Sequence, residues 1–435
     1  MGRYVVSDKN EQQEMLKTLG LKTLDDLYRD VDRSVLNPEL DLPEGKSEMQ
    51  VARIMEETAD KNVRFSQIYR GAGSYRHYIP SIVRSIVNKE EFVTAYTPYQ
   101  AEISQGILQS IFEYQTQMCE LTGLDVSNAS VYDGAVAASE AVFMTLERKK
   151  NTVLVSPTVN PETLEVVKTY CESRDVNVVM LKSDNGVTSL ADLEEKLSDD
   201  TASLLVQSPN YYGIIEDVAL LAQKVHTVKG KLIFSTNPVA LGLLKNAREY
   251  DADICVMEGQ PLGMPIGFGG PYLGIMTCKK ELMRRLPGRI VGETTDHDGR
   301  RIYVLTLQAR EQHIRREKAS SNICSNEALC AMTASVYLAA VGYKGLHQAA
   351  VNSASHAHYL QKKLEELGFK LRYDREFFHE FLVDSPIDPA RLEKHLAQYG
   401  ILSGLKVEKG VLFCTTELNT REDIDHLVDL IKEVL

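Results

Sequence analysis

Between residues 152 and 278, short apolar runs alternate with amphipathic stretches. A short run that is almost continuously apolar is typical of a strand buried on both faces, as in a parallel sheet that helices cover. The stretches between the runs place apolar residues at helical spacing, as in 216–228 and after the expected caps Ser189 and Asp192. The pattern predicts an α/β fold with a mostly parallel sheet, whose expected strands are residues 152–156, 176–181, 202–208, 231–235, 254–258 and 273–278.

The segments on either side of this alternation have different patterns. The first ~65 residues are polar with helical spacing, and Ser47 with Gln50 forms an expected capping box. The last ~100 residues predict a small α+β domain, with helices at 326–341 and 353–367, strands at 370–373 and 411–414, and a final helix from Asn419. We therefore expect three parts: a helical arm (1–65), a large α/β domain (66–325) and a smaller C-terminal α+β domain (326–435).

Composition and charge exclude several classes of function. The chain has 435 residues, 43% of them hydrophobic and 25% charged, which is enough for a large core in two or more domains. The net charge of −12 argues against a nucleic-acid partner, because binding to phosphates needs a basic face. The seven cysteines include no C-x-x-C pair, so we expect reduced thiols and no metal site. Without a signal-peptide pattern or an expected membrane span, we expect a cytoplasmic protein with no membrane partner.

Local details of the α/β segment resemble the fold-type-I pyridoxal-phosphate enzymes. A helix is expected to begin near Gly134, and the strand 254–258 is followed by the glycine-rich loops 259–263 and 267–271. A site of this type needs a lysine that binds the cofactor and a carboxylate that holds its pyridine nitrogen protonated. It also needs a helix N-terminus for the phosphate and commonly an arginine for the substrate carboxylate.

None of these four groups stands where it is expected. Residues 246–278 contain no lysine, and Gln260 and Pro261 occupy the place of the cofactor lysine. Asn237 stands in place of the acid, Asp133 puts a negative charge in the phosphate loop, and the strand around Phe413 has no arginine. Four vacancies together indicate that this chain has lost its own cofactor site.

Four longer motifs carry a closer resemblance. They are residues 69–80 (YRGAGSYRHYIP), 94–106 (TAYTPYQAEISQG), 258–263 (EGQPLG) and 309–324 (AREQHIRREKASSNIC). Over nearly all its length the chain resembles the P-protein of the glycine cleavage system, and within that family the subunit that corresponds to the N-terminal half of the single-chain form. The resemblance implies a pyridoxal-phosphate enzyme that decarboxylates glycine and passes the aminomethyl group to the lipoyl arm of the H-protein. It also implies a partner, subunit 2, which binds the cofactor covalently and assembles with this chain, two copies of each.

A chain without its own cofactor can still complete its partner's site, because fold-type-I sites lie at a dimer interface. The loop 94–106 offers Tyr96, Tyr99 and Gln100, whose phenols and amide can stack or donate hydrogen bonds. His77 is a further candidate contact, although a lone histidine more often has a structural role. By the same resemblance, the loop that ends in Ser320, Ser321 and Asn322 is expected to reach the phosphate of the partner's cofactor.

Two other readings stay open at this point. The first is a self-sufficient pyridoxal-phosphate enzyme, such as a desulfurase or an aminotransferase, with a lysine outside 246–278. Lys279 and Lys280 are the nearest candidates, but a surface position explains both. The second is a non-catalytic scaffold subunit without any residue in an active site. We expect this chain alone to be inactive, with no catalytic residue of its own.

Overall fold

The computed structural model describes residues 8–36, 41–323 and 325–435, which divide between Val63 and Arg64 into two compact units. The first unit contains α1 (Lys9–Thr18), the 3-10 helices η1 (Leu24–Tyr28) and η2 (Arg33–Val35), and α2 (Glu48–Ala59). The predicted capping box is confirmed: the backbone N–H of Ser47 donates to Gln50 at 2.9 Å, and that of Gln50 donates to Ser47 at 3.3 Å. Residues 1–7 and 37–40 of the expected arm and Cys324 of the fourth motif lie outside the described residues.

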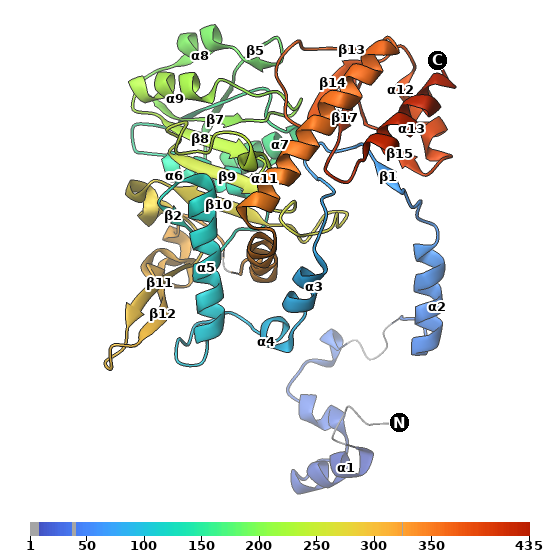
Figure 1. Ribbon diagram of the computed structural model, residues 1–435. Coiled ribbons are helices and arrows are strands. Elements are labelled where there is room, and N and C mark those ends of the chain that lie inside the picture. The colour runs from blue at the N-terminus through green and yellow to red at the C-terminus, as the bar shows by residue number, and fades with distance from the viewer. Residues whose placement is uncertain (1–7, 37–40, 324) are drawn as a thin grey trace. The chain divides into compact units, whose positions relative to one another are not determined.

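The second unit is built on a seven-stranded sheet of order β2-β10-β9-β8-β7-β3-β4 (Figure 1). The strands from β9 to β4 run parallel, and β10 pairs antiparallel with both β9 and β2. Each predicted strand is confirmed to within one or two residues at its ends. The bounds are β2 (Val126–Ser127), β3 (Thr152–Val155), β4 (Asn177–Met180), β7 (Thr201–Gln207), β8 (Lys231–Thr236), β9 (Ile254–Glu258) and β10 (Gly274–Cys278).

Helices cover both faces of this sheet, as the continuous apolar runs predict. Along one strand, neighbouring side chains point to opposite faces. Val153 and Val155 therefore join the core on the face of α6 (Gly134–Thr145) and α7 (Pro161–Glu172), whereas Leu154 joins the core on the other face. That second core also contains residues of α5 (Gln105–Thr122), α8 (Leu190–Lys196) and α9 (Val218–Thr227).

The C-terminal part has a four-stranded antiparallel sheet of order β13-β14-β17-β16. Its strands are β13 (Lys370–Leu371), β14 (Glu380–Asp384), β16 (Leu405–Val407) and β17 (Gly410–Cys414), and α12 (Pro389–Ala397) and α13 (Arg421–Lys432) pack with them (Figure 1). The expected apolar stripe of the last helix is buried at Ile424, Leu427, Val428 and Ile431. Because β1 (Gln67–Ile68) pairs with β15 (Ile401–Leu402), the beginning of residues 64–435 is joined to their C-terminal part. The division into a large and a small domain stays a prediction.

Shorter elements connect these layers. The hairpin of β11 (Ile290–Thr295) and β12 (Arg301–Thr306) packs on α5 through Leu108, Val291 and Tyr303. The others are α3 (Ser81–Val87), α4 (Glu90–Val93), β5 (Ser183–Asp184), β6 (Val187–Thr188), η3 (Ala240–Gly242), η4 (Lys280–Arg285), η5 (Gln308–Arg310), α10 (Gln312–Arg315) and η6 (Arg316–Lys318).

The helix α11 (Ala328–Glu366) differs from two expectations. It consists of two helical stretches that meet at a kink at Gly342, where φ is 60°, so the predicted end of the first helix at residue 341 is confirmed, whereas the second helix begins well before the predicted residue 353. By length and hydropathy it is also long and apolar enough to cross a bilayer, so the expectation that no segment would pass this test is wrong. Its buried residues pack into interior cores, however: Ala334 and Tyr337 into that of the large sheet, and Leu360 and Leu364 into that of the small sheet.

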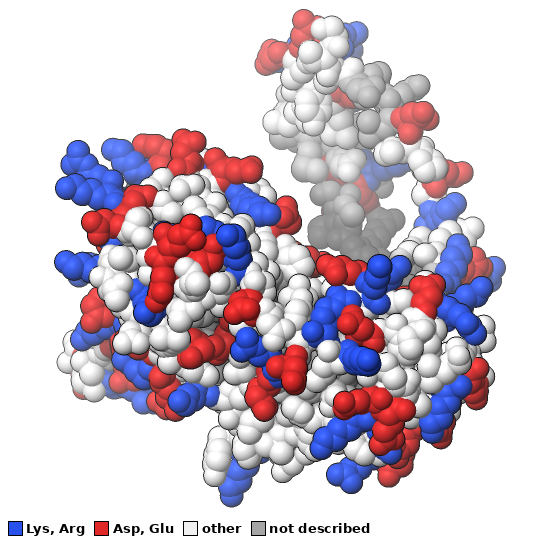
Figure 2. Space-filling view, turned by 90° about the horizontal axis from the view of Figure 1, so that it is seen from above, with Lys and Arg blue, Asp and Glu red and all other residues white. Residues whose placement is uncertain are grey.

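The surface of residues 64–435 carries mixed charge. On the face seen in Figure 2, Lys and Arg side chains are interspersed with Asp and Glu, and no continuous basic stripe runs across that face.

Candidate functional site

A cavity of about 340 Å³ lies at the carboxyl ends of β7, β8 and β9, beside the N-terminus of α6. This end of a parallel sheet is the usual place for a ligand. Its lining includes three acidic residues (Asp133, Glu162 and Glu258) and three amides (Asn160, Gln207 and Asn237), together with Pro261. Among the described residues that line it there is no Lys or Arg, so the cavity has the wrong charge for a phosphorylated ligand.

The N-terminus of α6 is already occupied by carboxylates of the chain itself. Glu258 accepts hydrogen bonds from the backbone N–H groups of Gly134 at 2.9 Å, Gln260 at 2.9 Å and Leu273 at 3.1 Å. Asp133 caps the same helix by accepting from Val136 N at 2.8 Å. Burial raises the pKa of Glu258 to about 7, against the three backbone hydrogen bonds that favour its charged form. Two N–H groups at this helix N-terminus, those of Gly134 and Val136, therefore already have carboxylate partners within the chain.

Gly134 permits this contact. A Cβ on Gly134 would lie 2.9 Å from both the Cβ and the backbone N of Glu258, so only glycine allows the helix to approach β9 this closely. The helix start that the sequence predicts near Gly134 is confirmed, but its N-terminal N–H group binds the carboxylate of Glu258 of the same chain.

The side chain in place of the cofactor lysine has a structural role. Gln260 is fully buried, accepts from Tyr75 N at 2.9 Å, and donates to the carbonyls of Tyr75 at 2.9 Å and Met264 at 2.8 Å. Asn237, in place of the acid, accepts from Val239 N at 2.9 Å. The strand β17 contains no arginine. The residues of this cavity do not fit pyridoxal phosphate, because they offer it no amine and present carboxylates where its phosphate would lie.

The structure places His77 inside the protein. It is 6% exposed, and its Nδ1 lies 2.7 Å from the carboxylate of Glu417. Its ring stacks at 6.4 Å on His379, whose pKa burial lowers well below the ordinary value. This geometry is that of a structural histidine, and a contact between His77 and a substrate stays a prediction.

The loop between α4 and α5 is the most exposed of the predicted contact segments. Tyr96 is 83% exposed, Gln100 is also exposed, and Tyr99 is half-exposed. Tyr99 accepts a hydrogen bond from the guanidinium of Arg289 at 3.0 Å, and its ring lies 6.3 Å from that of His313. The motifs 94–106 and 309–324, which are far apart in sequence, therefore meet at Tyr99 and His313. Arg289 was not singled out from the sequence, because nothing around it marks a site.

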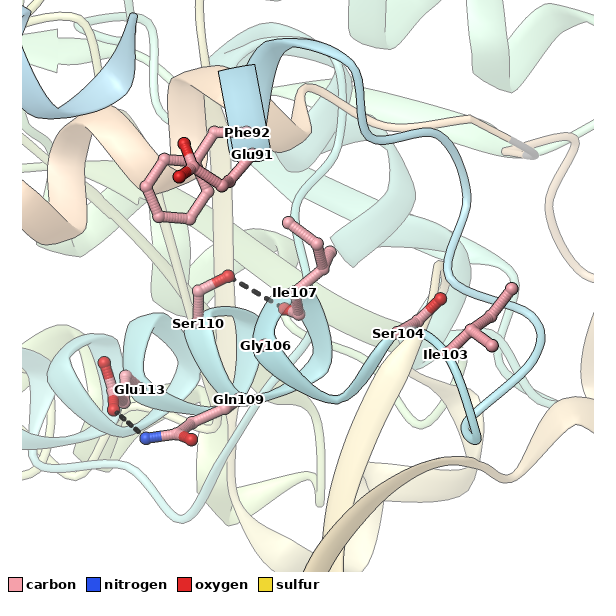
Figure 3. Close-up of a pocket in the computed structure, with 9 residues that line it drawn as sticks. All are labelled: Glu91, Phe92, Ile103, Ser104, Gly106, Ile107, Gln109, Ser110 and Glu113. Atoms are coloured by element: carbon pink, nitrogen blue, oxygen red, sulfur yellow. Dashed lines mark hydrogen bonds between the residues drawn. The ribbon is translucent and has the colours of Figure 1, made fainter. Parts of the chain in front are cut away.

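A groove of about 490 Å³ flanks the same loop (Figure 3). Phe92 of α4 faces the first turns of α5, and Ile103, which is 80% exposed, lies at the end of the loop. The polar side chains here mostly bond within α5: Ser110 donates to Ile107 O, and Gln109 donates to Glu113. The exposed side chain of Ile103, together with Phe92 and Ile107 in the lining, makes this surface suited to a protein contact.

The predicted phosphate loop lies on another side of α6. Ser321 donates to Glu140 at 2.9 Å, and burial raises the pKa of Glu140 to about 7. Ser320 and Asn322 are exposed, and the carbonyl of Ser320 accepts from Arg174 at 2.9 Å. A cavity of about 300 Å³ beside them is strongly basic, since its lining includes Arg284, Arg285, Arg310, Arg315 and Lys318.

Comparisons with known proteins agree with this geometry. Residues 2–431 match the family described as "Glycine cleavage system P-protein". The chain is 47% identical to "Probable glycine dehydrogenase (decarboxylating) subunit 1" of Moorella thermoacetica, and also 47% identical to the protein of the same description from Syntrophomonas wolfei; in both cases 99% of each chain is covered.

Solved structures show the same relationship. A structure described as "glycine decarboxylase (P-protein) of the glycine cleavage system, in inhibitor-bound form" has a TM-score of 0.94 and 40% identity, with 100% of both chains covered. An alanine–glyoxylate aminotransferase from Nostoc sp. has a TM-score of 0.59 at 16% identity, over 95% of this chain and all of its own, which shows the fold alone. The architecture is that of the fold-type-I pyridoxal-phosphate enzymes, and the chain belongs to the glycine cleavage system P-protein family.

Proposed function

We propose that this chain is subunit 1 of a two-subunit glycine decarboxylase. Together with subunit 2 it decarboxylates glycine and transfers the aminomethyl group to the lipoyl arm of the H-protein. The observation that carries the proposal is the cavity beside α6, where Glu258 and Asp133 occupy the helix N-terminus and no lysine stands among the described residues of the lining. A chain with the whole fold of the family and this cavity needs a partner for the cofactor.

The descriptions of the relatives support an enzyme that consists of two different subunits. Those from Moorella thermoacetica and Syntrophomonas wolfei are described as "subunit 1", which implies a second subunit. In the proposed assembly, two copies of each subunit combine in the cytoplasm, and subunit 2 holds pyridoxal phosphate through its lysine.

This chain contributes loops to the partner's site. Tyr96, Tyr99 and Gln100 are exposed or half-exposed in the loop that leads to Ile103 of the groove, so a partner that covers both would meet them. We assign Ser320, Ser321 and Asn322 to the phosphate of the partner's cofactor. The basic cavity next to Ser320 supports this assignment, because clustered guanidinium groups attract phosphate.

Cofactor binding tests which chain holds pyridoxal phosphate. Each subunit alone and the mixture are incubated with pyridoxal phosphate, dialysed and examined for the absorbance of bound cofactor. We expect no bound cofactor with this chain alone, and one equivalent of bound cofactor per subunit 2 in the mixture. Absorbance retained by this chain alone, and abolished by substituting one of its lysines, would instead establish a self-sufficient enzyme.

Substitution of the loop separates a contributing subunit from a scaffold. Tyr96→Phe and Tyr99→Phe are assayed in the mixed complex for decarboxylation of glycine in the presence of H-protein. At least one is expected to reduce the rate. Unchanged rates for both variants, with assembly intact, would favour a scaffold without residues in the site.

A further inference from the structure

Arg289 is a buried arginine without an ion pair. It lies in the segment between η4 and β11 and is 3% exposed. Among the described residues no carboxylate lies within 4.0 Å of its guanidinium, and its Nε has no hydrogen-bond partner. Burying an uncompensated charge is costly. An interaction between the guanidinium and a neighbouring group is therefore needed to explain why this position carries a charge.

That group is Tyr99. Nη2 of Arg289 donates to the phenol oxygen at 3.0 Å, and the guanidinium carbon lies 5.3 Å from the centre of the ring. A phenol that accepts such a bond still has its own proton to donate. For that proton Tyr99 has no acceptor among the described residues, and the side chain is 51% exposed. Arg289 thus fixes the phenol oxygen from the protein side, and the hydroxyl proton of Tyr99 remains available to a group that approaches from the exposed side.

The surroundings reinforce this orientation. The ring of His313 lies edge-on to Tyr99, and its Nδ1 lies 3.6 Å from the carboxylate of Glu311. The carbonyl of Gly288, the residue before Arg289, accepts from Arg310 at 2.6 Å. The positive charge behind Tyr99 is therefore available to an anion that meets the phenol.

We propose that Arg289 is a positioning residue that holds Tyr99 as a hydrogen-bond donor to an anionic group, a carboxylate or a phosphate, in the site shared with subunit 2. A donor backed by a guanidinium binds an anion more strongly than a free phenol does. The role also supplies an anion contact in a chain whose strand β17 lacks an arginine. This inference rests on the proposed function, because the anion is bound where the partner covers the loop.

The test is a double-mutant cycle in the mixed complex with Tyr99→Phe, Arg289→Met and the double variant, together with Arg289→Lys. If the anion is the substrate carboxylate, Tyr99→Phe raises the KM for glycine about ten- to hundredfold, the size of a charge-assisted hydrogen bond. If it is the cofactor phosphate, the dissociation constant of pyridoxal phosphate rises by that factor while the KM stays unchanged. In both cases the double variant is no worse than Tyr99→Phe, because the arginine acts through the phenol, and Arg289→Lys retains most of the function.

Controls separate this role from simple destabilisation. Tyr343→Phe removes the hydroxyl of an exposed tyrosine on α11, and Arg372→Met removes an arginine of the small sheet; both should leave KM and cofactor affinity unchanged. Additive effects of the two substitutions overturn the proposal. So does Tyr99→Phe with unchanged KM and cofactor affinity, and this variant keeps the fold even if Arg289→Met does not. An inactive wild-type mixture refutes the proposed function itself.

Discussion

The carboxylate of Glu258 accepts the backbone N–H of Gly134 at 2.9 Å, so the last residue of β9 occupies the N-terminus of α6. In a phosphate-binding member of this fold the same N–H groups face an anion from outside. Here the anion belongs to the chain, 124 residues away in sequence. The short segment 258–260 thus contains both the carboxylate at this helix N-terminus and Gln260, the residue that we expect in the place of the cofactor lysine.

Gly134→Ala should be destabilising. The added Cβ meets backbone atoms of Glu258, which cannot move aside as a flexible side chain would. We expect a loss of about 1–3 kcal/mol in the free energy of unfolding, typical of overpacking, measured by denaturant titration of this chain. Gly106→Ala is the matched control in α5, where nothing lies within 4 Å of the new Cβ, and it should be neutral or slightly stabilising. Equal effects of the two would contradict the close approach.

Placing a lysine at position 260 should not restore cofactor binding. Gln260→Lys removes three hydrogen bonds to Tyr75 and Met264 and buries an ammonium group, which should cost about 3 kcal/mol or more. The helix N-terminus would still be filled by Glu258 and Asp133. Thermal unfolding and absorbance after incubation with pyridoxal phosphate check both points, with the exposed Gln398→Lys as control. A stable variant that retains the cofactor would show that the cavity fits it after all.

Glu380 should make stability depend on pH. It is buried between the N–H of Ala72 at 2.6 Å and the hydroxyl of Tyr75 at 3.0 Å, and burial raises its pKa to about 7. Because the folded pKa lies above the unfolded value, the folded state holds more protons between about pH 4.5 and 7. The contribution of Glu380 to stability is therefore complete below that window and is lost as the pH rises through it.

The corresponding measurement compares unfolding free energies at pH 5 and pH 8. Glu380→Gln should reduce the fall between the two pH values by about 1–3 kcal/mol, since an amide does not ionise. The exposed Glu422→Gln on α13 should leave the fall unchanged. A Glu380→Gln variant with the wild-type pH profile would show that this carboxyl does not remain protonated.

The apolar groove beside the loop should bind subunit 2. Ile103→Asp places a charge on an 80% exposed side chain, so the isolated chain should unfold as the wild type does. If the partner buries this position, the dissociation constant of the complex should rise tenfold or more, as measured by sedimentation in the analytical ultracentrifuge or by surface plasmon resonance. Tyr343→Asp, at an exposed position on α11, serves as the comparison. Unchanged affinity for Ile103→Asp would place the interface elsewhere.

Local patterns predict most of the fold and the vacancies of the site. The strands β3, β4, β7, β8, β9 and β10 are nearly continuous apolar runs, a pattern typical of strands that are buried on both faces. The expected substitutions at Gln260 and Asn237 follow from the ends of two of these strands, and that at Asp133 follows from the predicted start of a helix near Gly134. In the structure Asp133, Asn237 and Pro261, which follows Gln260, line one cavity.

The rest depends on distances that the sequence does not contain. The early start of the second half of α11 was missed because the segment after Gly342 carries no long apolar stripe, and its helicity follows from packing of Leu346 and Ala350 against the large core. The Glu258–Gly134 contact joins two remote segments. No sequence pattern around Arg289 marks it as a functional residue. Its proposed role follows only from its hydrogen bond to Tyr99, which the fold brings close.

The most direct test of the account is exchange of labelled bicarbonate into glycine in the presence of H-protein, measured for this chain alone, for subunit 2 alone and for their mixture. The proposed function predicts no exchange with this chain alone at any concentration of pyridoxal phosphate, and for the mixture it predicts exchange that saturates at equal amounts of the two subunits. Exchange catalysed by this chain alone would contradict it.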